Sequence, residues 1–211
     1  MKKLNRKGFT LIELLAVITI MGILMLVAIP AISRTIENSR RDTFADVALK
    51  YMDAVSTSVL ADEIVCYPAD ANGKASGTSS SYGALEDGYY IFYLATISSK
   101  AEAVGTIAAG DIVQNTQDLL ENGGKSSWGS TDVYGYVAWQ KETQSNGQVK
   151  THYSVLLQDS AHHGMVSEQM KKDVKRSNVS SNIPTGNYKS KISATKTVQN
   201  GKTVKYVCKL G

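Results

Sequence analysis

The hydrophobic and polar positions divide the chain into an apolar stretch, an amphipathic stretch and a mixed remainder. Residues Phe9–Ile32 contain one ionisable side chain, that of Glu13. In a helix these 24 residues span about 36 Å, enough to cross a hydrocarbon layer of about 30 Å. Basic residues before this stretch are expected to hold the N-terminus in the cytoplasm and send the rest of the chain outward. They are Lys2, Lys3, Arg6 and Lys7.

Beyond Pro30 the apolar residues follow helical spacing, and charged residues occupy the other positions. Intervals of three, four or eight place the apolar residues on one stripe of a helix, which we expect to be buried. The stripe comprises Ile36, Phe44, Val47, Ala48, Tyr51, Val55 and Val59. We therefore predict one helix from Phe9 to about Asp62, in which residues 33–65 pack on a globular head formed by residues 66–211.

The remainder alternates strand, helix and turn signals. Gly88–Ile97 is rich in aromatic and β-branched residues and is predicted to be a strand. Asp111–Asn122, which starts with an acidic residue and precedes two glycines, is predicted to be a short helix. Ser167–Arg176 is predicted to form another helix.

Two hairpins are predicted from Asn-Gly pairs, which favour type I′ turns. Each pair lies between two stretches of strand composition. The hairpins are Val133–Gln144 with Val149–Gln158 around Asn146-Gly147, and Ser190–Gln199 with Lys202–Lys209 around Asn200-Gly201. The predicted fold class is α+β: a long N-terminal helix, membrane-spanning in its first half, packed on a C-terminal antiparallel β-sheet head.

Three explanations compete for the apolar N-terminus. A secretory signal has a shorter apolar run and a small-residue cleavage site, which this sequence lacks. A plain membrane anchor fits the length but leaves Glu13 unexplained, because an unpaired carboxylate in hydrocarbon is costly and usually functional. The third explanation comes from resemblance to a known family.

The string RKGFTLIELL, residues Arg6–Leu15, resembles the processing site of type IV prepilins. That family includes pilus subunits and the pseudopilins of type II secretion and DNA-uptake machines. The resemblance implies that a prepilin peptidase cleaves between Gly8 and Phe9, that residues 1–8 are a leader peptide, and that Phe9 becomes N-methylated. It also implies a pilin-like head, an inner-membrane assembly platform, and copies of this chain or other pilins as partners in a helical filament.

In such a filament, Glu13 is expected to form a contact between subunits. The methylated amine of Phe9 in one subunit can neutralise the Glu13 carboxylate of a neighbour, so that both charges leave water only in the correct register. Removing one partner would leave a buried unpaired charge, at a cost of about 3–5 kcal/mol. Pairing of Glu13 with its own N-terminus is the alternative, and it also fits the membrane-bound state before assembly.

Pro30 and Gly22 are expected to loosen the apolar helix. Proline removes one helical hydrogen bond, so a kink or melted turn is expected near residues 26–30. In pilins, a proline at the matching position marks where the helix loosens within the filament. The alternative is a tolerated proline of a membrane helix with no role in assembly.

The two cysteines, Cys66 and Cys208, lie on the extracytoplasmic side of the predicted topology, where oxidation is permitted. Many pilins carry a cysteine pair that closes the C-terminal region. A Cys66–Cys208 disulfide would tie the last strand to the end of the long helix. Two separate buried thiols are the alternative.

The net charge of +4 hides an uneven distribution. Four of the 23 basic residues belong to residues 1–8, and Lys171–Gly211 contains ten basic residues against one acidic residue. This basic block either complements acidic surface within and between subunits or binds DNA or an anionic cell-wall polymer. The residues of the second hypothesis are Lys171, Lys172, Lys175, Arg176, Lys189, Lys191, Lys196, Lys202 and Lys205.

No catalytic motif, metal-ligand spacing or cofactor fingerprint is present in the sequence, so we expect no catalytic residue, no metal and no cofactor. The favoured function is a structural subunit of a type IV pilus or related filament, made in the cytoplasmic membrane and assembled on the cell surface. A pseudopilin of a secretion or DNA-uptake machine is one alternative. A minor tip subunit or adhesin, acting through the basic block, is the other.

Overall fold

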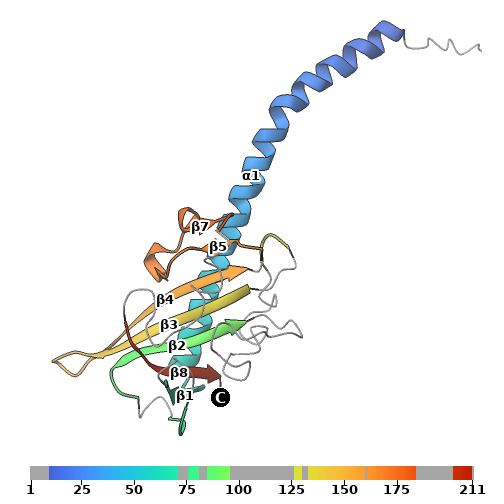
Figure 1. Cartoon of the computed structure of the whole chain (residues 1–211). Coiled ribbons are helices and arrows are strands. Elements are labelled where there is room, and N and C mark those ends of the chain that lie inside the picture. Colours follow the sequence, from blue (N-terminus) through green and yellow to red (C-terminus); the bar gives the residue numbers. More distant parts are fainter. Residues whose placement is uncertain are drawn as a thin grey trace, which may run out of the picture. The chain divides into compact units, whose positions relative to one another are not determined.

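This computed structural model describes residues 10–70, 76–80, 85–95, 126–129, 133–159, 161–183 and 202–210 (Figure 1). The predicted helix at 111–122 and the cleavage site at Gly8 and Phe9 lie outside these residues. The chain divides into two units, Met1–Ser39 and Arg40–Gly211.

One helix and eight strands dominate the described residues. The helix, α1, spans Leu11–Leu60, close to the predicted Phe9–Asp62. Two short 3₁₀ turns, η3 (Lys171–Asp173) and η4 (Arg176–Asn178), lie between the strands. The strands are β1 (Ile64–Pro68), β2 (Gly88–Ala95), β3 (Val133–Thr143), β4 (Val149–Asp159), β5 (Gly164–Met165), β6 (Gln169–Met170), β7 (Val179–Ser180) and β8 (Val204–Leu210).

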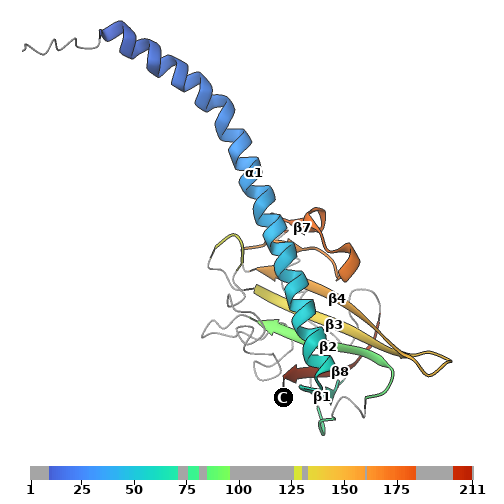
Figure 2. The ribbon, with the colours of Figure 1, turned by 180° about the vertical axis from the view of Figure 1, so that it is seen from behind.

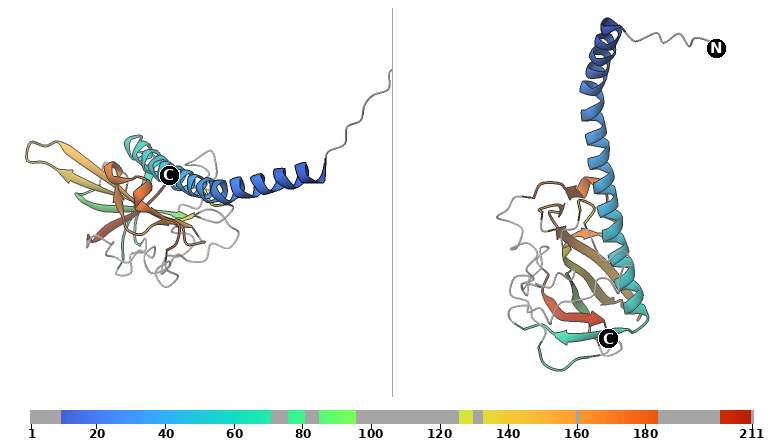
Figure 3. Two further views of the ribbon diagram at one scale, coloured as in Figure 1. Left: turned by 90° about the horizontal axis from the view of Figure 1, so that it is seen from above. Right: turned by 90° about the vertical axis from the view of Figure 1, so that its right-hand side faces the viewer.

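The strands form one mixed sheet in the order β1-β8-β2-β3-β4-β5-β7, and β6 pairs with β4. All pairs are antiparallel except β2 with β8, which is parallel. The part of α1 in the second unit crosses one face of this sheet (Figures 2 and 3). The predicted α+β, pilin-like arrangement of a long apolar helix and a β-sheet head is therefore confirmed.

The core joins the buried stripe of α1 to the strands. Phe44, Val47, Ala48, Tyr51, Val55 and Val59 are all buried, as predicted, and they belong to the same cluster as the residues of β2, β3 and β4. Ile36 is an exception, because 47% of its surface is exposed. It precedes the segment that packs on the sheet, so helical spacing alone was not enough to bury it.

The first predicted hairpin is confirmed, but its turn differs from the prediction. Strands β3 and β4 pair over their full length. The N–H of Gln144 donates to the carbonyl of Gln148, so the loop has three residues. Only Gly147 takes a positive φ, +80°, whereas a type I′ turn needs two such residues. The glycine therefore ends a three-residue loop.

Strand β8 is not the outer arm of a hairpin. It lies between β1 and β2, and Tyr206–Cys208 pair with both of these strands. Both of its edges are thus occupied there, so the predicted pairing of this stretch with the residues before Asn200-Gly201 is wrong. Residues 190–199 lie outside the described part of the chain.

Cys66 and Cys208 are joined by a disulfide. They face each other directly in the antiparallel β1–β8 pair, with their Cα atoms 4.0 Å apart. The main-chain N–H and C=O of Cys66 bond to Ser80 on the other side, so the cysteines form a non-hydrogen-bonded pair. Side chains are closest at such positions.

The predicted helix at Ser167–Arg176 is wrong. Gln169 and Met170 instead pair with β4, and the following residues make the two short 3₁₀ turns. Val174, between these turns, is buried in the core. Pairing with the sheet therefore overrides the helical propensity of this stretch.

Candidate functional site: the apolar helix and the polar contacts of the head

Thr10 and Glu13 cap the start of α1 with reciprocal hydrogen bonds. The main-chain N–H and the hydroxyl of Thr10 donate to Oε2 of Glu13 at 2.8 and 2.7 Å. The N–H of Glu13 donates to Oγ1 of Thr10 at 3.4 Å. This capping box fixes the Glu13 carboxylate at the helix start, and Thr10 makes both of its contacts with Oε2.

From Leu11 to Ile32 the surface of α1 is apolar apart from Glu13 and Thr19, and it is exposed on every side. Leu11 is 83% exposed and Leu26 is 77% exposed, and the other large apolar residues up to Ile32 are exposed as well. Among the described residues, α1 is the one helix that is long and apolar enough to cross a membrane. Such a continuous apolar surface requires a lipid or protein partner.

Gly22 and Pro30 leave the helix unbroken in this structure. Helical geometry continues through Pro30, so the melted turn predicted near residues 26–30 is not seen here. A Cβ atom at Gly22 would meet nothing within 4 Å, so the glycine leaves room for a neighbour to approach. Loosening of this stretch within a filament stays a prediction.

Residues 3–29 match the family model of the prokaryotic N-terminal methylation motif. This motif is the class III signal of type IV pilins. It coincides with the predicted leader and the apolar part of α1, and supports a prepilin-type protein that is processed by prepilin peptidase and assembles with other pilins. No solved structure matches the chain.

In the head, most described members of the basic block bind partners in the same head. Lys171 pairs with Asp53 of α1, and Arg176 pairs with Asp42 of α1 at 3.2 Å. Lys205 pairs with Glu86 at 2.9 Å. The ammonium of Lys202 donates to the Gln140 amide oxygen and lies 5.3 Å from the centre of the Tyr89 ring. Lys172 and Lys175 are exposed, and Lys189, Lys191 and Lys196 lie outside the described residues.

The Asp87 carboxylate, next to the Lys205 pair, binds Thr143 on β3. The main-chain N–H and the hydroxyl of Thr143 each donate to it at 2.8 Å. These two bonds lower the pKa of Asp87 below its ordinary value, and the bond from the N–H has the larger effect. The positive charges of Lys141 and Lys205 lower this pKa further, by a smaller amount. Desolvation opposes the shift.

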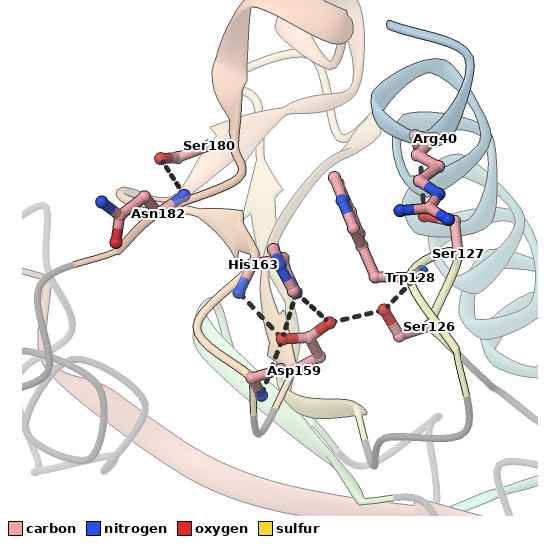
Figure 4. Close-up of polar contacts among 9 residues, drawn as sticks. Arg40, Ser126, Ser127, Trp128, Asp159, His163, Ser180 and Asn182 are labelled. Carbon is pink, nitrogen blue, oxygen red and sulfur yellow. Dashed lines mark hydrogen bonds and ion pairs between the residues drawn. The ribbon is translucent and has the colours of Figure 1, made fainter. Parts of the chain in front are cut away.

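A second polar cluster surrounds Asp159, whose side chain is fully buried at the end of β4 (Figure 4). One carboxylate oxygen accepts the N–H groups of Ala161 and His163, at 3.0 and 2.8 Å. The other accepts the hydroxyl of Ser126 at 2.5 Å and contacts Nδ1 of His163 at 2.8 Å. The carboxylate thus joins the 161–163 loop to the 126–129 segment.

The 126–129 segment in turn contacts the helix. Trp128 stacks on the His163 ring with centroids 4.4 Å apart, and its ring also packs against Phe44 at 5.8 Å. The hydroxyl of Ser127 donates to the main-chain oxygen of Arg40 at 2.8 Å. The cluster therefore connects β4 to α1 through two loops.

Ser126, His163 and Asp159 have the residue types of a hydrolase triad but not its arrangement. The Ser126 hydroxyl donates to the aspartate, whereas a nucleophilic serine donates to the histidine. The geometry supports a role in holding the loops together. The described residues contain no group of three or more His, Cys, Asp or Glu that could hold a metal ion.

A third cluster surrounds Glu168, between β5 and β6. Its carboxylate accepts the hydroxyls of Tyr89, Ser154 and Tyr136, the last at 2.8 Å. These three residues come from β2, β4 and β3, so one carboxylate fixes the 166–170 stretch to three strands. Sequence reasoning missed both this cluster and that of Asp159. The adjacent pair His162-His163 was a signal for the Asp159 cluster. The sequence did not reveal that cluster, because Ser126 lies far from the two histidines along the chain.

Proposed function

We propose that this chain is a structural subunit of a type IV pilus or related filament. It is made as a prepilin, anchored in the cytoplasmic membrane with its head outside, cleaved after Gly8 and N-methylated at Phe9. It then polymerises through the apolar part of α1 into an extracellular surface filament. The observation that carries the proposal is the coincidence of the methylation motif at residues 3–29 with the segment Leu11–Ile32 of α1, which exposes apolar side chains on every side.

The capping box supports a role for Glu13 in this polymerisation. Thr10 binds Oε2 of Glu13, which orients the carboxylate at the start of the helix, beside the predicted new N-terminus. In a packed filament core the amine of a neighbouring Phe9 would neutralise this charge. Because a one-sided loss leaves a buried charge, this pair would set the register of the subunits.

Mass analysis of sheared surface filaments tests the processing steps. The expected product begins at an N-methylated Phe9. A mature chain that keeps residues 1–8, or one found wholly in the membrane without a polymer, would refute the proposal.

Substitution of Glu13 tests the pairing. Glu13→Ala is expected to abolish filaments while cleavage after Gly8 continues. Thr19→Ala is the matched control, because Thr19 lies in the same helix and its hydroxyl donates to carbonyls of that helix, those of Leu15 and Ala16. Normal filaments from Glu13→Ala would contradict the pairing.

The two alternatives share this N-terminus and differ in partners and copy number. A pseudopilin would form a short assembly beside a secretion or DNA-uptake machine, and a tip adhesin would be present in few copies. The ion pairs of Lys171, Arg176 and Lys205 with carboxylates of the same head favour electrostatic complementarity over DNA or polymer binding for these residues. Counting the subunit in purified filaments separates a major subunit from a tip protein.

A further inference from the structure

The chain contains ten asparagines, and four of them are followed by glycine: Asn72, Asn122, Asn146 and Asn200. Of these four Asn-Gly pairs, Asn146-Gly147 lies in the part of the chain that the structure describes. It belongs to the exposed loop of the β3–β4 hairpin, which extends beyond Lys141, the last residue of β3 that pairs with β2 (Figure 1). Water therefore has free access to this pair.

An Asn-Gly pair can modify itself, because glycine has no side chain to shield its main-chain nitrogen. That nitrogen attacks Cγ of the asparagine: the new N–Cγ bond forms, the Cγ–Nδ2 bond breaks, and ammonia leaves. The attacking N–H gives its proton to water, and the leaving nitrogen takes a proton from water. The product is a cyclic succinimide, which a water molecule opens to aspartate or isoaspartate. Water is the only co-reactant that these steps need.

Three hydrogen bonds in the loop hold the reacting groups of Asn146-Gly147. The N–H of Gly147 donates to the carbonyl of Gln144 at 2.8 Å, so the attacking nitrogen is engaged. The N–H of Gln148 donates to Oδ1 of Asn146 at 3.0 Å, and Nδ2 of Asn146 donates to Oε1 of Gln148 at 3.1 Å. The attack needs a released Gly147 N–H and an Asn146 amide that is free to turn. Breaking these bonds therefore adds to the barrier of the reaction.

We propose that Asn146 is a site of spontaneous deamidation and that the side chain of Gln148 restrains the reaction in the folded head. Each event adds a negative charge to the exposed loop of the hairpin. Isoaspartate also adds a methylene group to the main chain, in a loop whose two ends are joined by the bond between Gln144 and Gln148. This chemistry is a property of the head itself and does not depend on polymerisation.

Mass spectrometry of the full-length chain measures the rate, after incubation in detergent at mildly alkaline pH in water enriched in heavy oxygen. Opening of the succinimide places the heavy oxygen at residue 146, which separates new events from earlier ones. Denaturation in guanidinium chloride is expected to raise the rate at Asn146 by about tenfold or more, because all three hydrogen bonds are lost. If Asn146 takes up no label in the denatured chain, the site is refuted. Equal rates in the folded and denatured chains would refute the restraint.

Substitutions of the two glutamines that flank the loop test the role of Gln148. Gln148→Ala is expected to raise the rate in the folded chain about threefold, because one exposed hydrogen bond is lost. Gln148→Glu keeps an acceptor oxygen for Nδ2 of Asn146 and is expected to keep the wild-type rate. Gln144→Ala is the matched control, because it keeps the main-chain carbonyl that binds Gly147, and its rate is expected to equal that of the wild type. If Gln148→Ala reacts no faster than Gln144→Ala, or if Gln148→Glu reacts as fast as Gln148→Ala, the side chain of Gln148 does not restrain the reaction.

Discussion

Replacing Asp159 by alanine tests how strongly one buried carboxylate holds the head together. The substitution removes the acceptor for two main-chain N–H groups, one hydroxyl and one imidazole nitrogen. A buried donor without an acceptor costs about 1–3 kcal/mol, offset in part because the aspartate no longer has to be desolvated. We expect Asp159→Ala to lower the free energy of unfolding by about 3 kcal/mol. For a head of this size that is a fall in Tm of about 10 °C.

Thermal unfolding of the full-length chain in detergent, followed by tryptophan fluorescence, measures this loss. Trp128 reports on the cluster and Trp139 on the core of the sheet. Asp159→Asn keeps the shape and one acceptor oxygen, so it is expected to cost less, about 1–2 kcal/mol. The control is Asp53→Ala, because Asp53 is 57% exposed and its ion pair with Lys171 is worth at most about 1 kcal/mol. If Asp159→Ala is no more harmful than Asp53→Ala, the cluster does not hold the loops to the helix.

Three further changes test other parts of the head. Gly135→Ala is expected to cost more stability in denaturant unfolding than Gly147→Ala, because a Cβ at Gly135 would lie 1.9 Å from a main-chain oxygen of β4, whereas Gly147 faces open space; equal losses would contradict this. Replacing both cysteines by serine removes a cross-link between residues 142 positions apart and is expected to cost about 2–5 kcal/mol, measured with and without reductant. Asp87→Asn removes a carboxylate whose pKa in the folded head is lowered by Thr143. The variant is therefore expected to be less stable than the wild type above the unfolded-state pKa of about 4, and this difference in stability should shrink as the pH falls below that value. A difference in stability that does not change with pH would refute the role of Thr143.

Several local features were predictable because their signals lie in adjacent residues. The apolar run and Glu13 indicated the helix and the signal that the methylation motif confirms. Asn146-Gly147 between two strand-like stretches indicated the β3–β4 hairpin, although the exact turn depended on which residue could take a positive φ. The periodic stripe of α1 indicated the face that packs on the sheet, apart from Ile36.

The clusters of the head were not predictable because their members are far apart in sequence. Glu168 binds hydroxyls from three strands, and Asp159 binds Ser126, which lies 33 residues away. The residues next to a serine, a tyrosine or an acidic residue in the sequence do not indicate which distant side chain it will bind. The same holds for the Arg176–Asp42 pair, which turns part of an apparent anion-binding block into contacts within one head.

The long helix, its apolar first half and the signal at its start can be recognised without the fold, because these features depend on side chains a few residues apart. The place of β8 between β1 and β2, parallel to β2, appears only in the folded head. Strand order depends on which distant edges meet and bury apolar surface together, and no periodicity along the chain records that. The Arg176–Asp42 ion pair follows from the same arrangement, since residues 42 and 176 meet only after folding.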